Sequence, residues 1–394
     1  DELYGFAAIV NGTFEEDRAA ESSACGKLEN DVWANDSVQT FCGYSVETDD
    51  STGKEDSVYV CYRYSSAQSR FVEVDPATVE PREQWIPLKN FSGSFDGQGH
   101  AIWELESVED STQDNLGFIA SVVGGTKASP VVIRNLTLRN AELKGRDTVG
   151  GIVAKNSGYL LLDDVASLMS ISARNHAGSF VGRNEGHLVV KKGVTSQVEG
   201  EKFVGGAVGS NSGSVDVDSL ALKITFPIAG YGTSGYTTYI VAKSHVGIVV
   251  GVNEESASLA IRNIEVEEIS VLADSVVGGL VGVNEKDAEI SISTTAMVYY
   301  LATDRKAKVG GFVAVNRGIV DIANSYIRGG VSGTMSGCFV GVNEDSLSIT
   351  NSYSACTWER LSGDPIVADC DGRISLKNTF YQESCDEPCS EPAA

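Results

Sequence analysis

The chain has 394 residues, of which 54 are acidic and 30 basic, and its formal net charge at pH 7 is −24. This balance argues against nucleic acid as a partner, because no basic stripe is present to neutralise phosphates. No apolar run approaches the roughly 18 residues that a membrane-spanning helix needs, so no membrane span is predicted.

The first segment, residues 1–12, is predicted to be a short amphipathic helix that caps the fold. Its apolar residues have helical spacing: Leu3, Phe6, Ala7, Ile9 and Val10. Because the segment has no basic stretch before its apolar residues, we expect that a secretion signal has been removed. Residues 13–84 then form a long polar segment with three cysteines.

The middle of the chain repeats one short phrase seven times. Its variants are VGGIVAKN (149–156), AGSFVGRN (177–184), VGGAVGSN (204–211), VGIVVGVN (246–253), VGGLVGVN (277–284), VGGFVAVN (309–316) and SGCFVGVN (336–343). Apart from one longer interval, successive phrases are separated by the length of one coil of a β-solenoid. Runs such as 259–271 alternate apolar and polar residues, as strands with one inward face do. We therefore predict an all-β, right-handed parallel β-helix.

An asparagine at the same place in every coil predicts a ladder of amide side chains, each bonded to those above and below at roughly 4.8 Å. The alternative is a row of polar side chains lining a ligand groove. The residues concerned are Asn156, Asn184, Asn211, Asn253, Asn284, Asn316 and Asn343.

The chain resembles the bacterial surface and secreted proteins built from GLUG repeats. Besides the repeats, it has the pieces of that family's leader in order: ELYGFAAIVNG (2–12), CGKL (25–28), WIPLKNFSGSFDGQGHAI (85–102), LGFIASV (116–122) and VIRNLTL (132–138). The resemblance implies an N-terminal cap at 1–12, a cysteine-containing insertion at 13–84, leader coils at 85–145, repeats at 146–360 and a C-terminal cap or tail at 361–394. It also implies a parallel β-helix with an adhesive or structural role.

The coil between Asn211 and Asn253 is about a dozen residues longer than the others. Its extra residues are rich in Gly, Ser, Thr and aromatic side chains, which could stack on sugar rings or pack against another molecule. A loop folded onto its own rod is the alternative. The proposed contact residues are Phe226, Tyr231, Tyr236 and Tyr239.

Eight cysteines indicate an oxidising compartment, and we expect an extracellular or cell-surface location. Three lie in the insertion and five lie near the C-terminus, so each group is odd, and a rod keeps them about 35 Å or more apart. Either the ends of two molecules are cross-linked or each end keeps one unpaired thiol. In the second case the free cysteines are Cys25 and Cys338, and the pairs are Cys42 with Cys61, Cys356 with Cys370, and Cys385 with Cys389.

No catalytic constellation is visible: the four histidines fall in no zinc or haem motif, and no G-x-S-x-G elbow occurs. Two pairs are candidates for the active site of a polysaccharide lyase or hydrolase: Asp163 with Asp164, and Asp96 with His100. The first are adjacent and would point to opposite faces of a strand, whereas the second lie in a glycine-rich turn. We therefore expect a protein that is not an enzyme.

No cofactor is predicted, and calcium is an open alternative at acidic segments that lack a known loop spacing. These segments are 47–56, Glu254–Glu255, Glu285–Asp287 and Glu344–Asp345.

Because a solenoid has an unpaired strand edge at each end, a homo-oligomer joined through the ends is expected. The sequence thus predicts an extracellular structural or adhesive β-solenoid that assembles end to end into filaments. A monomeric polysaccharide-binding adhesin is the second interpretation, and a polysaccharide lyase or hydrolase is the third.

Overall fold

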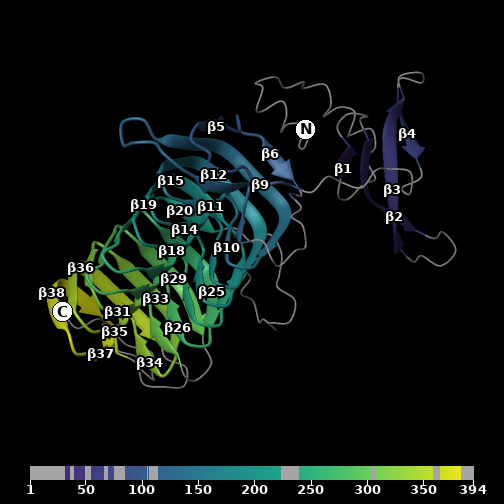
Figure 1. Ribbon diagram of the computed structural model, residues 1–394. Helices are drawn as coiled ribbons and strands as arrows, with labels where there is room; N and C mark the ends of the chain where they lie inside the picture. Colours follow the sequence, from purple (N-terminus) through teal and green to yellow (C-terminus); the bar gives the residue numbers. More distant parts are fainter. Residues whose placement is uncertain are drawn as a thin grey trace.

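The computed structural model shows a rod of stacked β-coils (Figure 1). It describes residues 32–35, 40–48, 55–65, 70–74, 85–103, 105, 114–222, 239–302, 307–357 and 364–382. The predicted helix at 1–12 lies outside these residues. The described part is all-β and contains no helix, and so none long and apolar enough to cross a membrane.

Each coil contributes strands to three stacks. Sheet 1 has eight parallel strands: β7 (Asn115–Leu116), β10 (Thr148–Gly150), β13 (His176–Gly178), β17 (Phe203–Gly205), β22 (His245–Gly247), β26 (Val276–Gly278), β30 (Lys308–Gly310) and β34 (Met335–Gly337). Sheet 2 has nine: β8 (Ile119–Val122), β11 (Val153–Asn156), β14 (Val181–Asn184), β18 (Val208–Asn211), β23 (Val250–Asn253), β27 (Val281–Asn284), β31 (Val313–Asn316), β35 (Val340–Asn343) and β37 (Val367–Cys370).

Sheet 3 holds the longer runs, with one to three strands per coil. Its strands are β5 (Ser94–Asp96), β6 (Ala101–Trp103), β9 (Val131–Gly145), β12 (Tyr159–Ala173), β15 (His187–Thr195), β16 (Val198–Gly200), β19 (Ser214–Asp218), β20 (Leu220–Leu222), β21 (Tyr239–Ala242), β24 (Ser258–Arg262), β25 (Glu265–Ala273), β28 (Glu289–Ser293), β29 (Ala296–Ala302), β32 (Ile319–Ala323), β33 (Tyr326–Ser332), β36 (Ser346–Thr357) and β38 (Arg373–Tyr381). The β-solenoid prediction is confirmed.

The repeated phrase forms the bend between sheets 1 and 2. Its first part is a strand of sheet 1 and its second part is a strand of sheet 2, and the backbone approaches itself closely at the glycine that ends the first strand. A Cβ atom on Gly278 would lie 1.7 Å from the carbonyl oxygen of Val281. This close backbone approach is the reason for glycine at that place in the phrase.

The core runs through the inside of the coils. The bend between sheets 1 and 2 presents one large side chain to it in four of the coils, and each is fully buried: Phe118, Phe180, Phe312 and Phe339. Sheet 3 buries alternate residues, for example Leu259 and Ile261 of β24. Full burial of one such side chain stabilises the fold by about 1.5–3 kcal/mol, so the repeat provides a continuous core.

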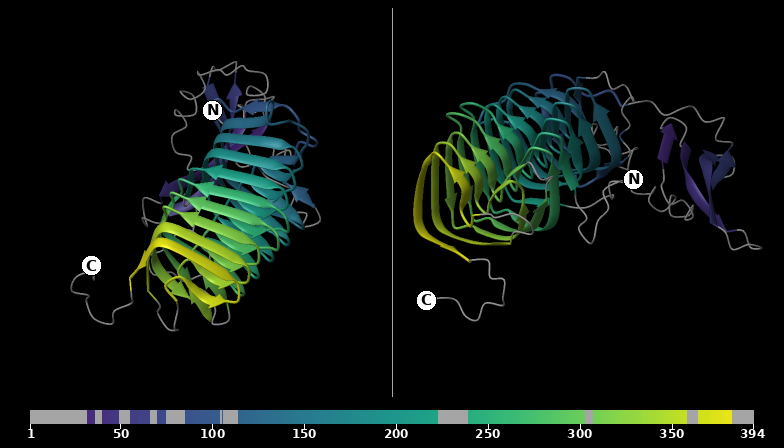
Figure 2. Two further views of the ribbon diagram at one scale, coloured as in Figure 1. Left: turned by 90° about the vertical axis from the view of Figure 1, so that its left-hand side faces the viewer. Right: turned by 90° about the horizontal axis from the view of Figure 1, so that it is seen from below.

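The two ends of the rod differ (Figure 2). At the N-terminal end, Leu88 and Phe91 bridge to Ile119 and Val122, and Trp85 stacks on Phe118 at 5.3 Å between ring centroids. At the C-terminal end, β38 is the last strand of sheet 3 in the described part of the chain. Within the described residues, the rod therefore begins with the segment 85–91 packed on β8 and ends with β38, which has no further strand beside it.

A separate antiparallel sheet precedes the rod. It consists of β1 (Val32–Asn35), β2 (Thr40–Thr48), β3 (Glu55–Ser65) and β4 (Arg70–Val74), in that order. Its strands lie within the predicted insertion, residues 13–84.

Candidate functional site

The seven repeated asparagines form a continuous hydrogen-bonded ladder inside the rod. Each Nδ2 donates to the Oδ1 of the next asparagine, at 2.7–2.9 Å over all six steps. All seven side chains are fully buried. The ladder is therefore structural, and none of these asparagines lines a surface groove.

A second asparagine column, which sequence reasoning missed, lies on the surface of sheet 3. Asn324, Asn351 and Asn378 have φ values of 49–50°, and Nδ2 of each later residue donates to Oδ1 of the one before, at 3.2 and 3.0 Å. Asparagine tolerates this left-handed conformation better than most residues. The signal in the sequence is an asparagine that recurs at one place in three successive coils, in NSY, NSY and NTF.

The disulfide prediction for the C-terminal coils is wrong. Cys338, expected to be free, is bonded to Cys356, with 5.9 Å between their Cα atoms. Both side chains belong to the main core, with 0% and 4% exposure. The prediction paired cysteines that are neighbours in the chain, whereas two inward positions of one coil meet across the core.

Cys370, expected to pair with Cys356, is free and exposed. It stands in register with Asn343, at the position that would continue the asparagine ladder, and Nδ2 of Asn343 lies 3.5 Å from its Sγ atom.

The remaining cysteine predictions are not tested. In the N-terminal sheet Cys42 is the register partner of Cys61, and their bonding stays a prediction. Cys25, Cys385 and Cys389 lie outside the described residues.

The aromatic loop also lies mostly outside the described residues, including Phe226, Tyr231 and Tyr236. Tyr239 begins β21 and is in register with Ser270 of β25.

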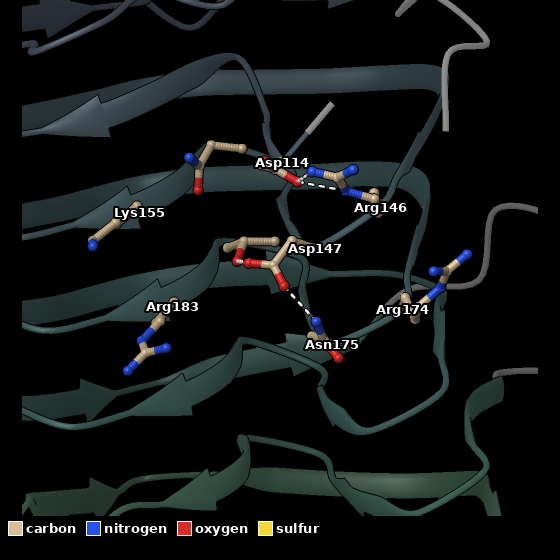
Figure 3. Close-up of a pocket in the computed structure, with 9 residues that line it drawn as sticks. Asp114, Arg146, Asp147, Lys155, Arg174, Asn175 and Arg183 are labelled. Atoms are coloured by element: carbon tan, nitrogen blue, oxygen red, sulfur yellow. Dashed lines mark hydrogen bonds and ion pairs between the residues drawn. The ribbon is translucent and has the colours of Figure 1, made fainter. Parts of the chain in front are cut away.

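A cationic pocket of about 460 Å³ lies near the N-terminal end of the rod, at the open side of the bend between sheets 1 and 2 (Figure 3). Its charged residues come from matching places in consecutive coils. The loop before β10 provides Arg146 and Asp147, and the equivalent loop of the next coil, before β13, provides Arg174 and Asn175. The residues lining the pocket are Asp114, Asn115, Arg146, Asp147, Thr148, Lys155, Arg174, Asn175 and Arg183.

Sheet 2 contributes two stacked cations to this pocket. Lys155 of β11 and Arg183 of β14 are register partners. Lys155 Nζ lies 2.9 Å from Glu185 Oε1, and Arg183 lies 3.3 Å from Glu185 and 3.6 Å from Glu254. The charges of these two cations are thus partly balanced by carboxylates that do not line the pocket.

The opposite wall has a different balance of charge. Arg146 Nε donates to Asp114 Oδ1 at 2.7 Å. Asp147 accepts hydrogen bonds from the Asn175 amide and, at 3.1 Å, from the Thr148 hydroxyl. Arg174 is exposed, and no carboxylate of the described residues lies within ion-pairing distance of it.

Two titratable groups behind this wall have shifted pKa values. Burial alone would raise the pKa of Asp147, but the bonds from Asn175 and Thr148 hold it below its usual value. Burial, reinforced by the charge of Arg183, lowers the pKa of His176 to about 4. His176 is therefore neutral near pH 7, and its Nδ1 lies 2.9 Å from the Ser210 hydroxyl.

The pocket does not continue along the rod, because the residues in register with Thr148 and Lys155 are apolar in β26 and β27. The column of Thr148 continues as His176, Phe203, His245 and Val276, and the column of Lys155 continues as Arg183, Ser210, Val252 and Val283. From Val252 onward these residues form a small apolar cluster, separate from the main core.

The candidate catalytic carboxylates make structural contacts. Asp96 accepts hydrogen bonds from Asn135, the Gln98 amide and Arg134, which lower its pKa. Asp163 and Asp164 are both on the surface, because Asp164 has a φ of 55° that interrupts the alternation of β12. Lys191 and Lys192 lie 3.5 and 2.7 Å from them.

The acidic turns proposed for calcium pair with arginines. Arg317 lies 3.0 Å from Glu285 and 3.2 Å from Glu344. Within the described residues no group of three His, Cys, Asp or Glu side chains could hold a metal ion, and 49–54 of the first acidic segment lie outside them.

Comparison with known proteins does not identify a family for this chain. No family model and no solved structure matches the chain. Over 95 residues, 24% of this chain, the sequence is 32% identical to Halomucin of Haloquadratum walsbyi. That stretch is 1% of Halomucin's length, so the similarity concerns one short region of a far longer protein.

Proposed function

We propose that the protein is an extracellular structural or adhesive β-solenoid, without enzymatic activity, that assembles end to end into filaments. The observation that carries this proposal is the exposure of core positions in the last described coil. Ile374 and Leu376 of β38 are in register with Leu347 and Ile349 of β36. The earlier pair is buried at 1% and 0% exposure, whereas Ile374 and Leu376 are exposed by 41% and 47%.

The last coil therefore presents core positions that a further coil would cover. Phe380 and Tyr381 of the same strand are exposed by 65% and 47%, and large exposed apolar groups along an unpaired strand edge favour association. In the proposed filament, β38 of one molecule lies against the first coil of the next. Such a head-to-tail contact does not close and continues as a fibre.

Membership of the GLUG-repeat surface proteins and a right-handed coil are parts of this proposal. Seven phrases that each fold into the same glycine bend support the first, and the strong preference for right-handed connections between parallel strands supports the second. The buried disulfide supports an oxidising, extracellular location.

Negative-stain microscopy and light scattering of the native protein test the proposal. We expect filaments one rod wide for the native chain and single rods for Leu376→Lys. Lys377→Glu is the control, because it changes charge on the same exposed strand without altering the apolar residues. Dimers alone would contradict the filament, since they indicate two C-terminal ends joined by a closed contact, and single rods of the native protein would contradict end assembly altogether.

A further inference from the structure

The cationic pocket is opposite in charge to the chain as a whole. In a protein with a net charge of −24, its lining includes four cationic side chains and two carboxylates: Arg146, Lys155, Arg174, Arg183, Asp114 and Asp147. Figure 3 shows Lys155 and Arg183 on one side and Arg174 on the other, with the aspartates between them. The arrangement favours an anion, but the aspartates disfavour one that carries more than a single charge.

Two buried atoms in the lining lack hydrogen-bond partners. One is a donor, Nε of Arg183, and the other is an acceptor, Oδ1 of Asn175. Nε of Arg183 is 3.3 Å from Glu185, close enough for ion pairing, yet the geometry of a hydrogen bond is not met. Asn175 directs its amide nitrogen to Asp147, which leaves the oxygen unmatched. Both side chains are only partly buried as a whole, so small rotations present these atoms to the pocket.

We propose that this pocket binds a hexuronate unit of an acidic polysaccharide. The sugar carboxylate accepts a hydrogen bond from Arg174, a hydroxyl on the other side of the ring accepts one from Nε of Arg183, and a third group, also a hydroxyl, donates to Oδ1 of Asn175. A phosphate monoester dianion has no hydroxyl to donate and carries two charges. An acidic peptide has carboxylates, but hydroxyl donors do not adjoin them. A volume of about 460 Å³ falls within the usual range of small-molecule sites.

This site is independent of end assembly, because the pocket lies near the first coils and the open strand edge lies at the last. Titration calorimetry with oligogalacturonate tests it on the native chain. We expect saturable binding that weakens as salt is raised, and no binding of a neutral galactose oligomer of the same length.

Arg174→Gln is the decisive variant, because this exposed arginine has no carboxylate partner within the described residues. Losing one charge-assisted hydrogen bond predicts at least roughly tenfold weaker binding. Arg328→Gln, an exposed arginine on β33, removes the same charge far along the rod and should leave the affinity unchanged. Arg183→Gln should weaken binding as Arg174→Gln does.

The proposal is overturned if oligogalacturonate does not bind at millimolar concentration, or if Arg174→Gln and Arg328→Gln have equal effects. It is also overturned if methyl phosphate, a dianion without a hydroxyl, or an oligo-aspartate peptide binds at least as tightly, since either would indicate recognition of charge alone. Unchanged thermal unfolding of each variant shows that its fold is intact.

Discussion

Asn284 occupies the middle of the buried ladder. It accepts a hydrogen bond from Asn253 and donates to Asn316, each at 2.9 Å, and its Nδ2 also lies 3.2 and 3.3 Å from the carbonyl oxygens of Ala288 and Ile319. The side chain thus joins neighbouring coils and satisfies backbone groups at the turn. A residue of similar shape that cannot donate would leave buried acceptors unmatched.

Asn284→Asp is therefore expected to destabilise the fold by about 2–4 kcal/mol, since it buries a carboxylate and removes these donors. Chemical denaturation gives the difference. Asn351→Asp is the matched control, because Asn351 is exposed and its column can exchange hydrogen bonds with water. Equal losses for both variants would show that burial of the ladder does not matter.

The cysteines of the last coils should differ in reactivity. Iodoacetamide is expected to label Cys370 in the native protein, because it is free and exposed. Cys338 and Cys356 should become labelled only after reduction in denaturant, because their bond is buried. Peptide mapping by mass spectrometry identifies the labelled cysteines. A peptide that links Cys356 to Cys370 would restore the pairing predicted from sequence.

His176 predicts a pH dependence of stability. Its pKa falls from 6.5 to about 4 on folding, so between these values the unfolded chain binds a proton and the folded chain does not. Stability is full above pH 6.5 and declines as the pH falls toward 4, by up to about 3 kcal/mol. Burial also lowers the pKa of His245, which adds to the loss in the same direction.

His176→Gln should flatten the dependence of unfolding free energy on pH between 6.5 and 4. His187→Gln, at an exposed histidine of β15, should leave the slope as it is. An unaltered slope in His176→Gln would mean that other groups cause the acid sensitivity.

At the scale of elements, the bend between sheets 1 and 2 depends on glycine. Gly278→Ala would place a Cβ 1.7 Å from the Val281 oxygen, so the backbone of the bend must move. We expect a loss of more than about 3 kcal/mol, visible in chemical denaturation or as a loss of soluble protein. Gly93→Ala is the control, because its Cβ would meet nothing nearer than 3.9 Å. Tolerance of both changes would contradict the close approach.

At the scale of the whole molecule, each coil contacts only its neighbours, so stability should fall toward the open end. Hydrogen exchange of single rods is expected to be faster in β38 than in the central strand β28. If end assembly occurs, protection of β38 should rise in filaments while that of β28 stays the same. Uniform protection along single rods would indicate a fully cooperative unit.

The sequence by itself determined the solenoid and the buried ladder. A repeat of one coil length returns Asn253, Asn284 and Asn316 to one place in each coil. A glycine likewise recurs where the backbone turns sharply, so both features are local and periodic. The sequence contains a weaker periodic signal for the cationic pocket, because Arg146 and Arg174 are separated along the chain by the same interval as Lys155 and Arg183.

Only the tertiary structure decided which side chains meet across a coil or at its ends. Cys338 bonds to Cys356 because both point into one core from opposite sides, and chain distance does not show this. Asp114 and Arg174 line one pocket because the coils that carry them are stacked. Ile374 is exposed at a core position because β38 is the last strand of sheet 3 in the described part of the chain. Periodicity specifies the position of a residue within a coil, whereas contacts between different positions depend on the path of the backbone around it.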